Sequence, residues 1–318
     1  MEKKELYVNV NEDTAFPTIS LALEAAKAFI GMEIVIYIAP GIYHEELVIN
    51  QNYISLIGTD ENSTIITFSK AAQELMPEGD KRGTFRTASV LIDADYFYAY
   101  RISFYNEAGQ GAKIGQALAV YADGDHLVFE NCRFDGYQDT LFTAPLPQKE
   151  LQPGGFKGPK EFAPRRVGRH LYKDCYIAGN VDFIFGGATA YFEGCELFMK
   201  ERKQPIKGYV TAPSTFEGQK YGYVFDRCRF TSECPKESAY LGRPWRNHAK
   251  VVILHSELGA HIRREGWHDW DKKESWDTTF FAEYGNYGEG AGTQRAPFVK
   301  LLTAEEASEY TRENVLGF

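Results

Sequence analysis

The 318-residue sequence has no long apolar stretch and no cluster of basic residues. No segment approaches the roughly 20 apolar residues that a membrane-spanning helix requires. The formal net charge is −9, and without a run of Lys or Arg, electrostatic attraction to nucleic acid or to an anionic membrane is disfavoured. We therefore expect neither a nucleic-acid-binding protein nor a membrane protein.

The sequence also lacks the common metal-binding and serine-hydrolase motifs. It contains no CxxC, no HExxH and no closely spaced pair among its seven histidines, so no metal site is predicted. It contains no GxSxG either, which argues against the serine chemistry of α/β hydrolases.

Behind the basic residues at the start of the chain there is no apolar segment of the kind found in secretory signals. The cysteines are odd in number, which favours free thiols in a reducing compartment. These two features predict a cytoplasmic location, with secretion after removal of a signal peptide as the alternative. The five cysteines are Cys132, Cys175, Cys195, Cys228 and Cys234.

A short pattern recurs in the chain: an aromatic residue, a Cys three residues later, and an apolar residue two after the Cys. Side chains three apart lie on opposite faces of a straight strand, so the chain must turn a corner if both face one core. The recurring Cys positions lie 43, 20 and 33 residues apart, which fits coils of roughly 20 residues with inserted loops. The pattern predicts a parallel β-helix with a ladder of buried cysteines. It occurs in FENCRF, YKDCYI, FEGCEL and FDRCRF, which begin at Phe129, Tyr172, Phe192 and Phe225.

Two of these units carry an aspartate at the same position. CRFDGYQDTLF and CYIAGNVDFIF both have Gly four, Asp seven and an aromatic residue ten positions after the Cys. If the units stack, Asp139 and Asp182 lie on neighbouring strands about 4.8 Å apart. Two carboxylates that close cannot both ionise freely, so one is held protonated or paired with a cation. The repeat therefore predicts an acid/base pair.

The other segments predict a single domain over residues 1–318. FPTISLALEAAKAF has helical spacing, with Thr14 or Thr18 as a cap, and is expected to cover the N-terminal end of the solenoid. Residues 144–167 are rich in Pro, Gly and charge, which predicts an inserted loop next to the active site. A helix is expected near residues 302–314, in an aromatic and Gly-rich C-terminal tail.

Residues near the aspartates supply the other parts of a site. Gln138 precedes Asp139, and Gln116 lies about one coil upstream; two amides can donate hydrogen bonds to a developing oxyanion. Arg243 suits bidentate contact with one carboxylate. Taken singly, each residue also fits an ordinary role as a solvated amide, a surface ion pair or a core aromatic. The candidate walls for sugar rings are Trp245, Phe142 and Phe185.

The segments GQALAVY, GYQDTLF, GNVDFIFG and YLGRPW resemble, in this order, the four signature segments of the pectin methylesterases, a family of carbohydrate esterases. YIAPGIYHEEL, REGWHDW and the tail FFAEYGNYGEGAGTQRAPF also look like segments of this family, so the resemblance covers nearly the whole chain. It implies an all-β, single-domain, right-handed parallel β-helix that needs no metal or organic cofactor. The implied substrate is methylated pectin or methylated oligogalacturonide.

By matching position, the resemblance makes Asp182 the nucleophile and Asp139 the general acid/base, with Arg243 as the partner of Asp182. Gln116 and Gln138 would donate to the oxyanion. The implied reaction is hydrolysis of C6 methyl esters of galacturonosyl units through an aspartyl acyl-enzyme, with release of methanol. The sugar subsites would be lined by Trp245, Phe142 and Phe185.

Two features depart from the family pattern. Asn180 stands where the family usually has Thr, which predicts a tuned environment rather than lost activity. The 144–167 insertion is expected to narrow the groove at one end, so that short oligomers are used at least as well as polymer.

Two alternatives remain from the residues alone. A non-catalytic β-helix that binds acidic glycans would keep the fold without needing the full set of polar residues. A hydrolase or lyase that cleaves the polygalacturonate backbone would also use paired carboxylates. The two glutamines and YLGRPW favour the esterase.

Overall fold

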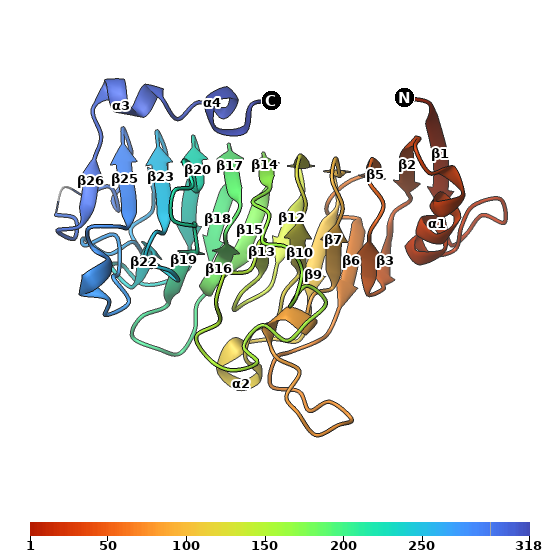
Figure 1. The fold of residues 1–318 in the computed structure, drawn as a ribbon, viewed down its shortest axis with the longest axis horizontal. Helices are drawn as coiled ribbons and strands as arrows, with labels where there is room; N and C mark the ends of the chain where they lie inside the picture. The colour runs from red at the N-terminus through yellow and green to blue at the C-terminus, as the bar shows by residue number, and fades with distance from the viewer. Residues whose placement is uncertain (293) are drawn as a thin grey trace.

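The computed structural model describes residues 1–292 and 294–318, and its strands are wound into a parallel β-helix (Figure 1). Every named strand pair is parallel, and the strands form three sheets that run along the same axis. One cluster of buried apolar side chains fills the coils from Leu6 to Phe281. The predicted fold class is confirmed.

Sheet A begins at the N-terminus and carries the aromatic residues of the repeat. Its strands, in order across the sheet, are β1 (Lys3–Val8), β2 (Glu33–Ile38), β5 (Ile54–Gly58), β8 (Tyr98–Tyr100), β11 (Leu127–Glu130), β14 (Arg169–Lys173), β17 (Thr189–Glu193), β20 (Tyr223–Asp226), β23 (Lys250–Leu254), β25 (Phe280–Tyr284) and β26 (Val299–Leu301).

Sheets B and C complete each coil. Sheet B contains β3 (Gly41–His44), β6 (Thr64–Phe68), β9 (Ser103–Asn106), β12 (Arg133–Asp135), β15 (Tyr176–Gly179), β18 (Glu196–Met199), β21 (Arg229–Ser232) and β24 (Glu257–Leu258). Sheet C contains β4 (Leu47–Ile49), β7 (Val90–Asp93), β10 (Val120–Asp123), β13 (Leu141–Thr143), β16 (Val181–Gly186), β19 (Gly208–Pro213) and β22 (Ala239–Gly242).

The corners between sheets A and B lie where the repeat predicts them. The residue before each recurring Cys has a positive φ of 50° to 64°, a left-handed conformation that breaks a strand and redirects the chain. These corner residues are Asn131, Asp174, Gly194 and Arg227.

The aromatic residues of the repeat stack inside the coils. The ring centres of neighbouring members are 5.0, 4.6 and 4.4 Å apart, and the four cysteines that follow them are at most 2% exposed. Each repeat places the same residue types at equivalent positions, so the side chains of one coil are buried against those of the next coil. The stacked aromatic residues are Phe129, Tyr172, Phe192 and Phe225.

Short helices cover the ends and one face of the solenoid. Helix α1 (Ile19–Ala26) starts at Thr18, whose side chain accepts from the Leu21 amide, and buries its apolar side against the first coil, followed by the 3-10 turn η1 (Lys27–Phe29). Among the described residues, no helix is long and apolar enough to cross a membrane. The other short helices are α2 (Gly111–Ile114), η2 (Thr84–Arg86) and η3 (Lys273–Ser275).

The helix expected over residues 302–314 is instead two helices, α3 (Ala304–Ser308) and α4 (Arg312–Leu316), which lie over sheet A (Figure 1). Thr303 caps α3 and Thr311 caps α4. A Thr at an N-cap needs an extended backbone, so Thr311 interrupts what reads as one helical segment.

Candidate active site

Asp139 and Asp182 lie opposite each other on neighbouring coils of sheet C. Leu141 of β13 pairs with Ile184 of β16, and the same register two residues earlier places Asp139 beside Asp182. The Asp139 amide donates to the Val181 carbonyl over 3.0 Å, which fixes the two backbones side by side. The structure thus brings together the two aspartates that the repeat singles out.

Both aspartates have a left-handed backbone conformation. The angle φ is +63° at Asp139 and +51° at Asp182, a region that most side chains avoid but that Asp tolerates. At Asp182 the pairing of β16 with β19 shifts register. Conformations of this kind concentrate at functional sites, where the surrounding structure holds them in place.

Arg243 holds one carboxylate of the pair and not the other. Its Nε donates to Oδ1 of Asp182 over 2.9 Å and its Nη2 donates to Oδ2 over 2.7 Å. Burial raises the pKa of both carboxyls, which are 8% and 7% exposed. The Asp182 charge adds to the rise at Asp139, whose pKa lies well above its usual range, whereas Arg243 opposes the rise at Asp182. Asp182 therefore loses its proton first, and Asp139 keeps its proton.

Two aromatic rings hold Arg243 in place. The Cζ atom of Arg243 lies 3.9 Å from the ring centre of Tyr209 and 3.7 Å from that of Trp270. Stacking of this kind suits the planar guanidinium. Sequence reasoning did not assign either ring to the site, although Trp270 belongs to the quoted segment REGWHDW.

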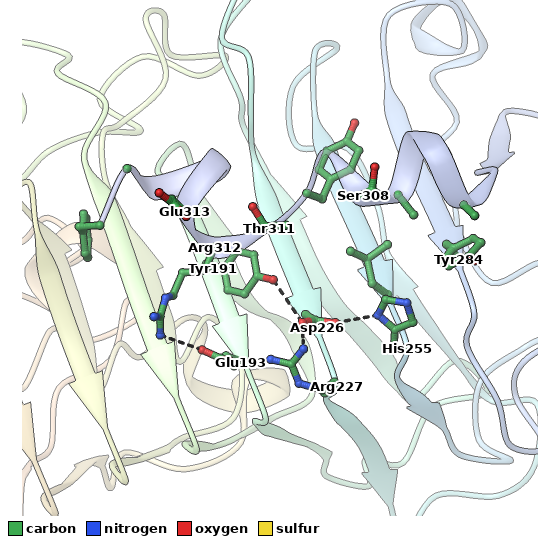
Figure 2. Close-up of a pocket in the computed structure, with 16 residues that line it drawn as sticks. Tyr191, Glu193, Asp226, Arg227, His255, Tyr284, Ser308, Thr311, Arg312 and Glu313 are labelled. Atoms are coloured by element: carbon green, nitrogen blue, oxygen red, sulfur yellow. Dashed lines mark hydrogen bonds and ion pairs between the residues drawn. The ribbon is translucent and has the colours of Figure 1, made fainter.

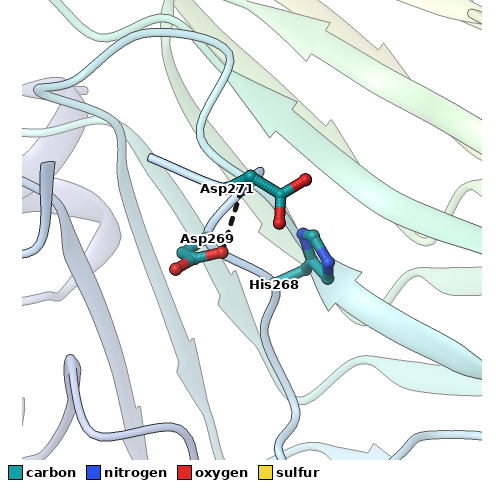
Figure 3. Close-up of side chains that lie close together, drawn as sticks. All are labelled: His268, Asp269 and Asp271. Carbon is teal, nitrogen blue, oxygen red and sulfur yellow. Dashed lines mark hydrogen bonds between the residues drawn. The ribbon is translucent and has the colours of Figure 1, made fainter. Parts of the chain in front are cut away.

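Trp270 lies in a tight turn, and Figure 3 shows three residues of this turn, His268, Asp269 and Asp271. The Trp270 amide donates to Nδ1 of His268 over 2.9 Å, and the Asp271 amide donates to Asp269 over 3.0 Å. The other Asp269 oxygen accepts from the Trp276 indole. Donor atoms of His268, Asp269 and Asp271 come within 4.8 Å of one another, but these hydrogen bonds already use one ring nitrogen and both Asp269 oxygens. We therefore assign this cluster to the shape of the turn.

The two glutamines lie next to the aspartates. The Ala117 amide donates to the Gln138 carbonyl over 3.1 Å, which places the coil of Gln116 directly beside that of Gln138. Neither side-chain amide has a hydrogen-bond partner among the residues that the structure describes, and both side chains are partly exposed. Gly111 of α2 packs against Gln138 so closely that a Cβ atom there would lie 2.6 Å from the Gln138 Cβ. Both amides are thus free to bind a ligand.

The family model for pectinesterases matches residues 5–149 and 165–317. The chain belongs to the pectinesterase family. It is 33% identical over 288 residues to Pectinesterase 31 of Arabidopsis thaliana, covering 88% of this chain and 82% of that protein. Other relatives from this plant are longer: the chain spans 40% of Putative pectinesterase/pectinesterase inhibitor 43.

Solved structures of this family have the same fold. A pectin methylesterase in complex with a hexasaccharide superposes with a TM-score of 0.80 at 30% identity, covering 98% of this chain and 96% of that one. The Erwinia chrysanthemi enzyme gives a TM-score of 0.79 at 29% identity, with coverage of 100% and 97%. These matches confirm the predicted family and identify the chain as a carboxylic ester hydrolase.

The predicted cytoplasmic location is wrong. The relatives are pectinesterases of plants and microbes, and a similar structure from Aspergillus niger retains an N-acetylglucosamine stub on an asparagine, a modification of secreted proteins. The prediction relied on the missing apolar segment near the start of the sequence and on unpaired cysteines. All five are free, and four of them are buried in the coils, where they act as small core residues and say little about the redox compartment.

Asn180 lies two residues before Asp182, at the bend between β15 and β16. The side chain is buried, and its Oδ1 accepts from the Val181 amide over 2.8 Å. Its own backbone amide donates to the Tyr137 carbonyl in the coil of Asp139. Asn180 therefore shapes the bend that leads into Asp182.

The three aromatic residues assigned to sugar subsites differ in accessibility. Phe142 and Phe185 are 0% and 3% exposed, whereas Trp245 is partly exposed and packs against Phe185 with ring centres 5.7 Å apart. Of the three rings, Trp245 alone keeps an exposed part, and Phe185 packs against it. Their place in the sugar subsites remains a prediction.

A basic cavity of about 700 Å³ lies beside the aspartates. Lys113 of α2 lines one side, and Arg202 and Lys203 line the other, with Glu201 as the acidic residue of the lining. Arg202 is close enough to Asp182 to oppose, together with Arg243, the rise in pKa that burial causes there. The cavity is therefore locally basic, although the protein as a whole has a net negative charge.

A second cavity, of about 740 Å³, lies on sheet A beneath the C-terminal helices (Figure 2). Asp226 accepts a hydrogen bond from the Tyr191 hydroxyl at 3.2 Å and lies 3.0 Å from Nδ1 of His255. Arg312 of α4 donates to Glu193 over 3.2 Å. The contact of Arg312 with Glu193 ties the tail to sheet A, whereas Asp139 and Asp182 lie on sheet C.

Proposed function

We propose that the protein hydrolyses the C6 methyl esters of galacturonosyl units in pectin or methylated oligogalacturonides through a covalent bond to Asp182. The support is the family membership, a relative solved in complex with a hexasaccharide, and the arrangement of the two aspartates. No metal or organic cofactor takes part in the proposed reaction.

In the first step an oxygen of the Asp182 carboxylate attacks the ester carbonyl carbon. The carbonyl oxygen becomes an oxyanion, and the side-chain amides of Gln116 and Gln138 donate hydrogen bonds to it. Collapse of this intermediate breaks the bond to the methoxy oxygen, and Asp139 gives that oxygen its proton. Methanol leaves, and an anhydride joins Asp182 to the galacturonosyl unit.

In the second step the ionised Asp139 takes a proton from a water molecule that attacks the anhydride. Cleavage of the anhydride regenerates the Asp182 carboxylate and frees the intact sugar chain, which now carries a C6 carboxyl group, and Asp139 is again protonated. At the start of each cycle Asp182 is therefore ionised and Asp139 is protonated. Arg243 supports this difference because it binds Asp182 and not Asp139.

The observation that carries the proposal is the contrast within the pair: Arg243 makes two hydrogen bonds to Asp182, while Asp139 faces that charge without a cation of its own and has a strongly raised pKa. A nucleophile next to an acid needs this contrast. A glycan-binding protein without catalytic activity does not.

The test is to incubate the protein with highly methylated pectin and to measure methanol, new reducing ends and absorbance from unsaturated ends. The proposal predicts methanol without shorter chains. New reducing ends or unsaturated ends without methanol indicate a backbone-cleaving hydrolase or lyase, and binding of pectin without any product indicates a glycan-binding protein.

A further inference from the structure

A row of outward-facing residues crosses sheet C beside the catalytic aspartates. Its members are in register from strand to strand and belong to a cluster separate from the core inside the coils. On an open sheet this row would face solvent, yet every member is at most 8% exposed. The row consists of Leu91, Tyr121, Phe142, Phe185 and Ala212.

Phe85, from outside the coils, covers this row, and Phe156 packs on Phe85 in turn. Phe85 of η2 lies over Phe142, with ring centres 5.0 Å apart. Phe156, from the 144–167 insertion, packs edge-on against Phe85 at 5.8 Å and against Trp245 at 6.4 Å. Phe156 is 6% exposed, so it is an integral part of the cover.

Ion pairs fasten the insertion across the sheet. Lys157 pairs with Asp80 at 2.8 Å, and Arg166 pairs with Asp95 at 2.5 Å. Lys160 bridges the ends of β7 and β10, at 2.5 Å from Asp93 and 3.2 Å from Asp123.

The backbone of the insertion also packs closely on the cover. Gly158 lies so near Phe85 that a Cβ atom at Gly158 would be 2.8 Å from the Phe85 carbonyl oxygen. The cover is therefore anchored at both ends.

The outer part of the cover lies outside the family pattern. Residues 150–164 fall between the two segments that the pectinesterase model matches, and Phe156 is one of these residues. Phe85 lies in the matched segment 5–149, so the family pattern describes the inner ring of the cover but not the outer one.

We propose that the insertion determines substrate length because Phe156 holds Phe85 over the aromatic row and so withholds that row from the sugar chain. This inference rests on the proposed function. Each extra sugar unit of a long chain adds affinity only if it meets a protein surface, and the covered row offers none. Trp245 remains partly exposed at the edge of the cover, so a short methylated oligogalacturonide makes most of the contacts that the polymer makes.

The experiment compares kcat/KM for highly methylated pectin with kcat/KM for a methylated tetragalacturonide. Phe156→Ala removes the ring that packs on Phe85 and so frees Phe85 to move off the row. Phe162→Ala is the matched control because Phe162 lies in the same insertion and is 92% exposed. We expect the polymer-to-tetramer ratio to rise about fivefold in Phe156→Ala, which corresponds to about 1 kcal/mol, and to stay unchanged in Phe162→Ala. A variant with residues 150–164 replaced by a short Gly/Ser linker should show the same rise.

A folded Phe156→Ala protein with the wild-type ratio would overturn the inference, and so would a wild-type enzyme that strongly prefers the polymer. If Phe156→Ala fails to fold, Phe156→Leu, which shortens the cover but keeps an apolar side chain, decides in the same way. Absence of methanol from both substrates with the wild type refutes the proposed function instead.

Discussion

Arg243 reaches across an entire coil to bind Asp182. Arg243 follows β22 and Asp182 lies in β16, and the intervening strand is β19. The guanidinium passes over the ring of Tyr209 in β19, 3.9 Å from its centre, before it meets the carboxylate. The ionisation of the proposed nucleophile therefore depends on the stacking of three coils, and any change that moves one of them alters the chemistry.

Arg243→Lys should shift the acidic limb of the kcat/KM profile to higher pH. Burial raises the Asp182 pKa, and Arg243 opposes that rise; a single ammonium replaces two aligned hydrogen bonds poorly. The measurement is methanol release as a function of pH. Arg246→Lys is the control, because Arg246 contacts the Trp245 and Lys149 carbonyls rather than an aspartate. An unchanged acidic limb in Arg243→Lys contradicts the assigned role.

Asp139→Asn should abolish turnover and stabilise the fold at neutral pH. The folded-state pKa of Asp139 is raised, so the wild type loses stability as the pH rises from the usual value near 3.8 through the folded-state pKa. The asparagine has no charge to bury, so the variant does not lose this stability. Each tenfold difference in the acid dissociation constant of Asp139 between the folded and unfolded states corresponds to about 1.4 kcal/mol.

Thermal melting of both proteins across the acidic and neutral range checks this prediction. The difference in Tm should be small at the acidic end and grow with pH. The exposed Asp13, changed to Asn, is the control. A pH-independent difference between Asp139→Asn and the wild type argues against a protonated Asp139.

Gly111→Ala should lower the rate in the same way as Gln138→Ala, although Gly111 is not in the reaction. The added methyl group would lie 2.6 Å from the Gln138 Cβ, so the glutamine must move away from the oxyanion. Loss of one such donor costs roughly 10² to 10³ in kcat. Gly292→Ala, where the nearest atoms are 4.0 Å away, should have no effect. A fully active Gly111→Ala enzyme means that Gln138 is not a donor.

Replacing Lys113 and Lys203 by alanine should weaken the binding of de-esterified oligogalacturonate and reduce its salt dependence. Both residues line the basic cavity beside the aspartates, and exposed charges act over a distance that added salt shortens. Calorimetry at low and high salt measures the effect. Lys236, exposed and paired with Glu289, serves as the control. Equal affinity and equal salt dependence in the double variant would exclude the cavity from substrate binding.

The repeat could be predicted from the sequence because it uses one residue type per position. The aromatic and Cys positions predict both the ladder inside the coils and its corners, and the shared spacing of Asp139 and Asp182 predicts that they stack. The spacing within each repeat shows which residues occupy equivalent positions in successive coils, and loops inserted between the repeats do not change that spacing.

Contacts that cross between coils through irregular segments could not be predicted in this way. Tyr209 and Trp270 meet Arg243 from two different parts of the chain, and nothing in their spacing indicates this. Phe142 is covered by Phe85 and lies beneath the cover that Phe156 completes, so an aromatic residue that looks like a sugar platform is buried. Thr311 fits a helix interior in sequence but acts as a cap.

The most direct test of the proposed mechanism is to trap the covalent intermediate. The enzyme is mixed with a methylated oligogalacturonide, quenched within one turnover in hydroxylamine, and digested for mass spectrometry. We predict a hydroxamate on Asp182, absent from the Asp182→Asn variant. A modification on Asp139, or a full burst of methanol with no hydroxamate on either Asp182 or the galacturonosyl carbonyl, would contradict the mechanism.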